Sequence, residues 1–156
     1  TLVLESKAGG RRNVPASDYF KGLYETERRD EELLIEARIP VIANGEVSAF
    51  GELARRHGDF ALAGVAMHGR VADGVISGLR PVYFGSEDRP VLGAATAAAV
   101  EGKGATEDTF AAVNEALGAD LDPMSNFHAD AATRLQLARV LTKRALTSMV
   151  NGGGVV

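Results

Sequence analysis

The sequence contains no cysteine among its 156 residues. The chain therefore forms no disulfide and offers no thiolate ligand to zinc or to an iron–sulphur cluster. It also has no apolar run of about 18 residues or more, and its first residues do not form a secretory signal peptide. Together these absences predict a soluble protein of the reducing cytoplasm.

The sequence also lacks an excess of positive charge and the local motifs of common active sites. Its formal net charge of −4 argues against nucleic-acid binding, because no basic face dominates. No serine lies in a G-x-S-x-G elbow, and the glycines at 9–10 and 152–154 match neither a dinucleotide fingerprint nor a Walker loop. The histidines His57, His68 and His128 are too scattered for a metal signature, which favours structural or surface roles. We predict no catalytic residue and no metal ligand in this chain.

The composition is that of a folded protein. Hydrophobic residues make up 46% of the chain and charged residues 24%, so a real core can form. A chain of 156 residues accommodates one ordinary domain, or one small domain with part of another. Because Thr1 opens directly into a strand pattern, we expect a piece cut from a longer protein.

Short strands and turns are predicted over the first 43 residues. Lys7 to Gly10 predicts a hairpin turn, and Pro40 ends the last strand because proline cannot continue a ladder. Residues 25–32 mix both signs of charge, which is typical of a solvated loop; a surface facing a partner subunit is the alternative. The predicted elements are strands over 2–5, 11–15 and 33–39 and a capped helical turn over 17–20.

The pattern changes beyond a predicted domain boundary at 41–45. Strands come first and helices follow, an order that predicts an α+β fold rather than an alternating parallel one. We expect a three-stranded antiparallel sheet with a helical bundle on one face, and a flexible tail over 151–156. Asp88 and Pro90 are suited to start the first helix. The predicted elements are strands over 47–55, 61–68 and 75–84 and helices over 88–102, 106–118 and 130–150.

The last predicted helix has two distinct sets of side chains. One set is an apolar stripe at spacings of three and four, which predicts the buried face. The other set is basic and is interpreted as a complement to the negative C-terminal end of the helix dipole. The stripe is Leu135, Ala138, Leu141, Ala145 and Met149, and the basic set is Arg134, Arg139, Lys143 and Arg144.

The segment 55–65, RRHGDFALAGV, is the most informative stretch of the chain. Two arginines and a tight Gly-Asp turn lead through Phe60 into a small-residue apolar strand. From chemistry alone, this loop places one aromatic ring and one carboxylate at the start of a strand. The alternative is that Phe60 is simply a plug of the hydrophobic core.

Several short blocks, in the same order and spacing, resemble a known family. Residues 14–22, VPASDYFKG, resemble V-P-A-x-D-[FY]-[FY]-x-G, and residues 30–40, DEELLIEARIP, resemble an E-L-L strand that ends in R-[IV]-P. The segment 55–65 resembles R-x-G-D-[FY]-A, and residues 120–146 resemble a closing D-x-x-P…L-x-R-A-L segment. On these blocks the chain resembles the later half of the FAD-binding medium subunit of molybdenum hydroxylases, the xanthine and carbon monoxide dehydrogenase family.

The resemblance implies a role in electron transfer. In this family a molybdenum-binding large subunit hydroxylates a small molecule, and electrons pass through two 2Fe–2S clusters of a small subunit to FAD and then to an acceptor. The cofactor does the redox chemistry, while the protein positions and tunes it. The family's diphosphate-binding glycine motifs are absent here, so the resemblance assigns them to a missing N-terminal half. It also assigns 1–43 to the second lobe of the FAD-binding domain and 44–150 to the C-terminal domain.

The resemblance also implies which residues contact FAD. Phe60 lies against the isoalloxazine ring, Gly58 and Asp59 shape the turn, and Arg56 supports it electrostatically. Leu33 or Leu34 contacts the flavin from its strand, with Leu33 favoured because alternation points only one inward. The family often has a lysine near 49–52, for which this chain has Gly51 or Glu52. The alternative is a stand-alone interaction module of the same fold without flavin.

Overall fold

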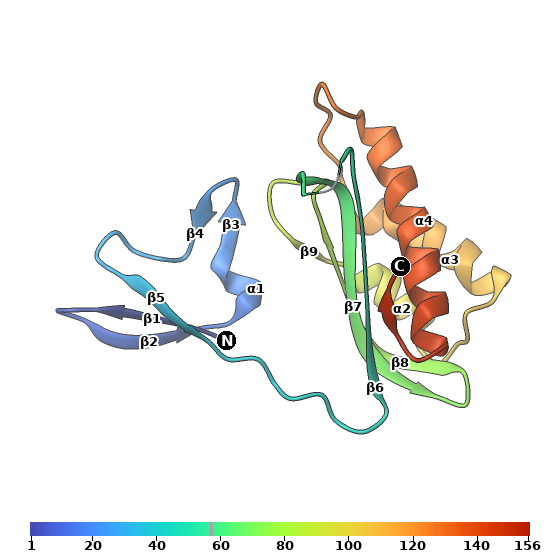
Figure 1. The fold of residues 1–156 in the computed structure, drawn as a ribbon, viewed down its shortest axis with the longest axis horizontal. Coiled ribbons are helices and arrows are strands. Elements are labelled where there is room, and N and C mark those ends of the chain that lie inside the picture. Colours follow the sequence, from blue (N-terminus) through green and yellow to red (C-terminus); the bar gives the residue numbers. More distant parts are fainter. Residues whose placement is uncertain (57) are drawn as a thin grey trace. The chain divides into compact units, whose positions relative to one another are not determined.

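The computed structural model describes residues 1–56 and 58–156 and divides into two compact units (Figure 1). The first unit is Thr1–Ile42 and the second is Ala43–Val156, so the division falls inside the segment 41–45. Each unit has its own buried cluster of hydrophobic side chains.

The first unit is built on a three-stranded antiparallel sheet with the strand order β2-β1-β5. The predicted hairpin is present, because β1 and β2 pair directly and the Ser6 hydroxyl accepts the Gly9 amide at 2.9 Å. The helical turn is also present, but it starts after Pro15 without the predicted side-chain cap. The elements are β1 (Leu2–Ser6), β2 (Gly10–Val14), α1 (Ala16–Tyr19), β3 (Phe20–Gly22), β4 (Glu25–Thr26) and β5 (Leu33–Ala37).

The charged segment 25–32 is more than a solvated loop. Glu32 is buried, and its carboxylate accepts two hydrogen bonds from the Arg12 guanidinium of β2, at 2.6 and 2.8 Å. The backbone amide of Arg29 donates to the same carboxylate at 2.8 Å. These contacts, led by the Arg12 hydrogen bonds, lower the pKa of Glu32 from 4.5 to about 2. The loop is therefore pinned to β2 through one ionised carboxylate.

Replacing Glu32 with glutamine is expected to remove part of the acid sensitivity of the first unit. Because the folded-state pKa lies below the ordinary value, the ionised Glu32 stabilises the fold above about pH 4.5, and this contribution is lost as the pH falls toward about 2. The free energy of unfolding, followed by the NMR signals of β1, should depend less steeply on pH in this window than in the wild type. The difference in slope should correspond to about one bound proton. Glu31→Gln, at the exposed neighbouring carboxylate, is the matched control. An unchanged slope in Glu32→Gln would contradict the proposed pinning.

The second unit confirms the α+β class and contains a larger sheet than predicted. The three expected antiparallel strands are β6, β7 and β8, and short strands are added at both edges, in the order β10-β6-β7-β8-β9. Figure 1 shows the helices packed on one face of this sheet. The elements are β6 (Glu46–Ala54), β7 (Ala61–Ala72), β8 (Val75–Phe84), β9 (Val91–Leu92), α2 (Ala94–Val100), α3 (Glu107–Asp120), α4 (Ala131–Val150) and β10 (Gly154–Val155).

The core of the second unit forms between the sheet and the predicted stripe of α4. Asp130 caps this helix, accepting the Thr133 amide at 2.7 Å. Four of the five stripe residues are fully buried, and Leu135 packs against them at the margin. The four buried stripe residues are Ala138, Leu141, Ala145 and Met149.

Two predicted helix boundaries are wrong, and the first of them is set by partners distant in sequence. The first helix starts at Ala94 rather than near Asp88 and Pro90, because Val91–Leu92 pair with β8 as an edge strand. Its first free amides, those of Ala95 and Thr96, donate to the Asp120 carboxylate at 2.8 and 2.7 Å. The second helix begins after the Thr106 cap as predicted but runs through Gly118 to Asp120.

The prediction of a flexible tail over 151–156 is also wrong. Gly154–Val155 form β10, which pairs in parallel with Ala49 and Phe50 of β6. The Val156 amide extends this pairing by donating to the Phe50 carbonyl at 2.8 Å. The glycines at 152–154 therefore turn the chain back onto the sheet edge and do not release it.

Candidate functional site

The loop between β6 and β7 carries four of the six residues predicted to contact the flavin. It includes His57, which lies outside the described residues. Gly58 has a φ of +79°, and, its chain neighbours aside, no atom of the described residues lies within 4 Å of where its Cβ would be. Glycine is favoured there by its backbone conformation and not by crowding. The Asp59 amide closes the turn by donating to the Arg56 carbonyl at 3.2 Å.

The Asp59 carboxylate organises this turn. It accepts the Phe60 amide at 2.9 Å and pairs with the Arg55 guanidinium at 3.1 Å and with Arg56 Nε at 3.5 Å. The Phe60 amide first, and the two arginines after it, hold the pKa of Asp59 below its ordinary value, while partial burial opposes them. The side chain is only 15% exposed. Arg56, predicted to support the turn, pairs with Asp59, and so does Arg55, for which the sequence predicts no role.

Phe60 projects from this turn into solvent. Its side chain is 93% exposed, so the interpretation of Phe60 as a core plug is wrong. A large aromatic ring left this exposed beside a fixed backbone is suited to cover a flat apolar partner. The arrangement offers an aromatic face, an ionised carboxylate and two guanidinium groups within one short loop.

Leu33 and Leu34 lie on β5 of the first unit, and both are exposed, by 69% and 45%. The predicted alternation, with only one leucine buried, is wrong because every residue of β5 is exposed. β5 is the edge strand of its sheet and packs mainly along β1, so side chains on both of its faces stay exposed. In addition, Val3 faces Glu36 while Leu4 faces Leu34, so Ile35 is an extra residue in a bulge. A bulge breaks the strict alternation of side chains along a strand. Leu33 and Ile35 both line a hollow of about 380 Å³ beside β1.

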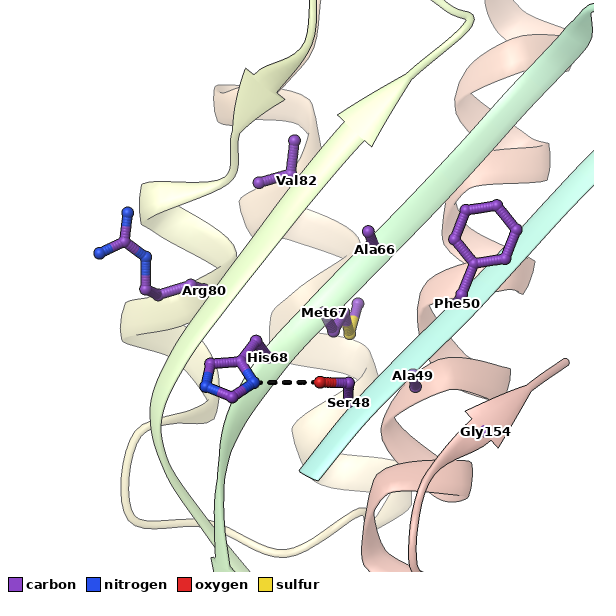
Figure 2. Close-up of a pocket in the computed structure, with 9 residues that line it drawn as sticks. All are labelled: Ser48, Ala49, Phe50, Ala66, Met67, His68, Arg80, Val82 and Gly154. Atoms are coloured by element: carbon purple, nitrogen blue, oxygen red, sulfur yellow. Dashed lines mark hydrogen bonds between the residues drawn. The ribbon is translucent and has the colours of Figure 1, made fainter. Parts of the chain in front are cut away.

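A second feature, absent from the sequence-based predictions, is a shallow pocket of about 530 Å³ on the second unit's sheet (Figure 2). Phe50, Ala66 and Val82 present apolar surface, and the Phe50 ring stacks on Phe84 with centroids 5.7 Å apart. The sequence carries a sign of this surface, because Phe50 and Ala66, which are at least partly exposed, alternate with buried Ala49 and Met67. The pocket is lined by Ser48, Ala49, Phe50, Ala66, Met67, His68, Arg80, Val82 and Gly154.

Ser48 and His68 form a cross-strand pair at the edge of this pocket. The serine Oγ lies 3.0 Å from His68 Nδ1, as drawn in Figure 2, and Glu46 Oε2 lies 3.6 Å from His68 Nε2. The second distance is too long for a hydrogen bond that would orient the imidazole as a base. The pair therefore ties β6 to β7 and does not activate the serine.

Neither a metal centre nor a membrane span is found within residues 1–56 and 58–156. No three histidine, aspartate or glutamate side chains of this part of the chain are grouped to hold a metal ion. No helix in the same part is both long enough and apolar enough to cross a membrane.

Comparisons with known proteins identify the family of this chain. Residues 48–149 match the family model of the CO dehydrogenase flavoprotein C-terminal domain. The glyceraldehyde dehydrogenase medium chain of Sulfolobus acidocaldarius is 30% identical over 145 residues, covering 93% of this chain and 51% of the relative. The carbon monoxide dehydrogenase medium chain of Hydrogenophaga pseudoflava is 31% identical over 147 residues, covering 94% and 51%.

Solved structures give the same result. A carbon monoxide dehydrogenase from Hydrogenophaga pseudoflava superposes with a TM-score of 0.86 at 34% identity, covering 94% of this chain and 50% of that one. Quinoline 2-oxidoreductase from Pseudomonas putida superposes with a TM-score of 0.87 at 31% identity, covering 97% and 52%. The chain spans about half the length of the curated relatives it matches. The resemblance drawn from the motifs is confirmed, and the chain belongs to the CO dehydrogenase flavoprotein C-terminal domain family.

Proposed function

We propose that this chain is the later half of the FAD-binding medium subunit of a molybdenum hydroxylase, and that its 55–60 turn contacts the flavin. The observation that carries the proposal is the exposed Phe60 ring on a turn fixed by Asp59. Family membership over residues 48–149 and the relatives named as medium chains of dehydrogenases support it.

The described residues fit the ring of FAD but not its diphosphate. A diphosphate is bound by several backbone amides and positive charges, and no glycine-rich loop of that kind opens a helix within residues 1–56 and 58–156. The aromatic turn fits a flat heterocycle. We therefore assign the isoalloxazine contacts to this chain and the diphosphate contacts to the preceding half of the protein.

FAD, when bound, supplies the electron-transfer chemistry. Phe60 would lie against the ring and would exclude water from it. Ionised Asp59 holds the Phe60 backbone in place, and Arg55 and Arg56 fix that carboxylate. Leu33 and Leu34 offer further apolar surface from β5. No residue of this chain is assigned acid–base or nucleophilic catalysis.

The proposed partners are the other subunits of such an enzyme. A large subunit carries the molybdenum cofactor, and a small subunit carries two 2Fe–2S clusters that deliver electrons to FAD. We assign 1–43 to the end of the FAD-binding domain and 44–150 to the C-terminal domain, and place the complex in the cytoplasm. The substrate of the enzyme is a small molecule hydroxylated on the large subunit.

The proposal is tested by comparing FAD binding of the full-length subunit and of the 156-residue chain. The full-length protein is expected to purify yellow with about one FAD per chain, whereas the short chain should retain none after gel filtration, because it lacks the charge-assisted diphosphate contacts. The measurement is visible absorbance of the protein peak. A stoichiometric yellow complex of the short chain would contradict the division of contacts. A colourless full-length protein would favour the stand-alone interaction module.

A further inference from the structure

Arg134 occupies an unexpected place in the second unit. The sequence pattern groups it with basic residues that complement the C-terminal end of the helix dipole. That interpretation is wrong for Arg134, because α4 begins at Ala131 and Arg134 therefore lies in its first turn. The dipole is positive at this end and disfavours a cation. The side chain is also 4% exposed, which is unusual for arginine.

Within residues 1–56 and 58–156, the hydrogen bonds of the buried guanidinium go to backbone oxygens. One of its terminal nitrogens donates to the carbonyls of Leu62 at 2.7 Å and of Gly85 at 2.6 Å. Its Nε is buried without a hydrogen-bond partner, and none of the ion pairs found among residues 1–56 and 58–156 includes Arg134. A buried cation without a carboxylate partner is a poor stabilising device, since an apolar residue of similar size avoids the desolvation penalty. The role of Arg134 must therefore come from the two backbone segments whose carbonyls it binds.

Both carbonyls belong to irregular backbone at one end of the sheet. Leu53 of β6 faces Ala63, and Ala54 faces Ala61, so Leu62 is the extra residue of a bulge in β7. The extra residue of a bulge is left out of the ladder. The Leu62 carbonyl instead accepts a hydrogen bond from the Arg134 side chain.

The second carbonyl secures the end of the neighbouring strand. Gly85 directly follows β8 and has a φ of +81°, and a Cβ there would lie 2.7 Å from the Ala61 carbonyl oxygen. The backbone after β8 therefore packs directly against the start of β7. By binding Leu62 and Gly85 with one nitrogen, Arg134 joins these two segments to α4.

We propose that Arg134 is a positioning residue that holds the β7 bulge and thereby sets the direction of the Asp59–Phe60 turn. Phe60 precedes Leu62 by two residues, so a shift of the Leu62 carbonyl moves the base of the aromatic turn. Asp59 fixes the turn internally, while Arg134 fixes it to the helical layer. The role assigned to Phe60 rests on the proposed flavin contact; the anchoring of the bulge does not.

The first test is hydrogen exchange of the full-length protein with Arg134→Met. Exchange in peptides covering 59–64 is expected to accelerate by about tenfold or more, because two charge-assisted hydrogen bonds are lost, with little change in 107–120. Arg134→Lys, which retains a donor, should restore part of the protection. Arg144→Met, at an exposed position of the same helix, is the matched control and should leave 59–64 unchanged.

The second test is the fluorescence of the bound flavin in the same variants. Arg134→Met should change the flavin emission and Arg134→Lys should change it less, whereas Arg144→Met should not. Unchanged exchange in 59–64, or equal acceleration in 59–64 and 107–120, would overturn the positioning role. If Arg134→Met does not fold, the comparison of Arg134→Lys with Arg144→Met decides in the same way. If the wild-type protein binds no flavin, the proposed function fails, while the exchange experiment still decides whether Arg134 anchors the bulge.

Discussion

Replacing Phe60 with alanine is expected to weaken FAD retention by the full-length subunit while leaving its fold intact. Stacking contributes about 0.5–1.5 kcal/mol beyond area burial, so loss of the ring alone weakens binding about 2- to 12-fold. Water would also reach the isoalloxazine and change its fluorescence and reduction potential. Because Phe60 is 93% exposed, the free energy of unfolding of the apoprotein should change by no more than about 0.5 kcal/mol.

Phe127→Ala is the matched control for this experiment. Phe127 belongs to the same unit and is 91% exposed, but it lies outside the 55–60 turn. The control should alter neither FAD retention nor flavin fluorescence. Equal flavin properties in Phe60→Ala and the wild type, measured by titration and by emission of the bound flavin, would remove Phe60 from the proposed site.

The largest expected effect on stability is that of Leu117→Ala. Leu117 is fully buried in α3 and belongs to the core cluster of the second unit. Truncation of a buried leucine costs about 2–5 kcal/mol, which is a large part of the roughly 5–15 kcal/mol that stabilises a typical domain. Denaturant unfolding should show a lower midpoint with little change in slope.

Leu92→Ala provides the comparison at a half-exposed position of the edge strand β9. Its free energy of unfolding should fall by much less than that of Leu117→Ala, because less apolar area leaves contact with the protein. Equal losses in the two variants would mean that the helical layer does not form the core as described.

The elements that the sequence predicts well are those with local signals. The hairpin of the first unit follows from a glycine turn between two short strands, and Asp73-Gly74 marks the turn between β7 and β8. The stripe of α4 and its Asp130 cap are set by spacing and by one side-chain hydrogen bond. These features depend on residues at most a few positions apart.

The elements that the sequence does not predict depend on distant partners. The start of α2 is determined by Asp120, which accepts amides 24 and 25 residues earlier in the chain. The pairing of β10 depends on β6, about 100 residues away, and a glycine run gives no sign of it. Tertiary contacts of this kind override local preference.

The candidate site shows the same division. The Gly58-Asp59 turn is readable from the sequence, because a glycine and an adjacent carboxylate shape the local backbone. The exposure of both Leu33 and Leu34 is not readable from the sequence, because it depends on which elements pack against the two faces of β5. The contacts of Arg134 span 72 and 49 residues and have no local signal at all.

The short strand β10 also affects how the protein behaves at high concentration. The free edge of a sheet is a template for strands of other molecules, and native proteins shield such edges against aggregation. β10 occupies the β6 edge at Ala49 and Phe50, beside an exposed aromatic ring. Removing residues 153–156 would expose unpaired backbone groups next to that ring and favour self-association through intermolecular strand pairing. Any shortened version made for crystallisation or spectroscopy should therefore keep these residues.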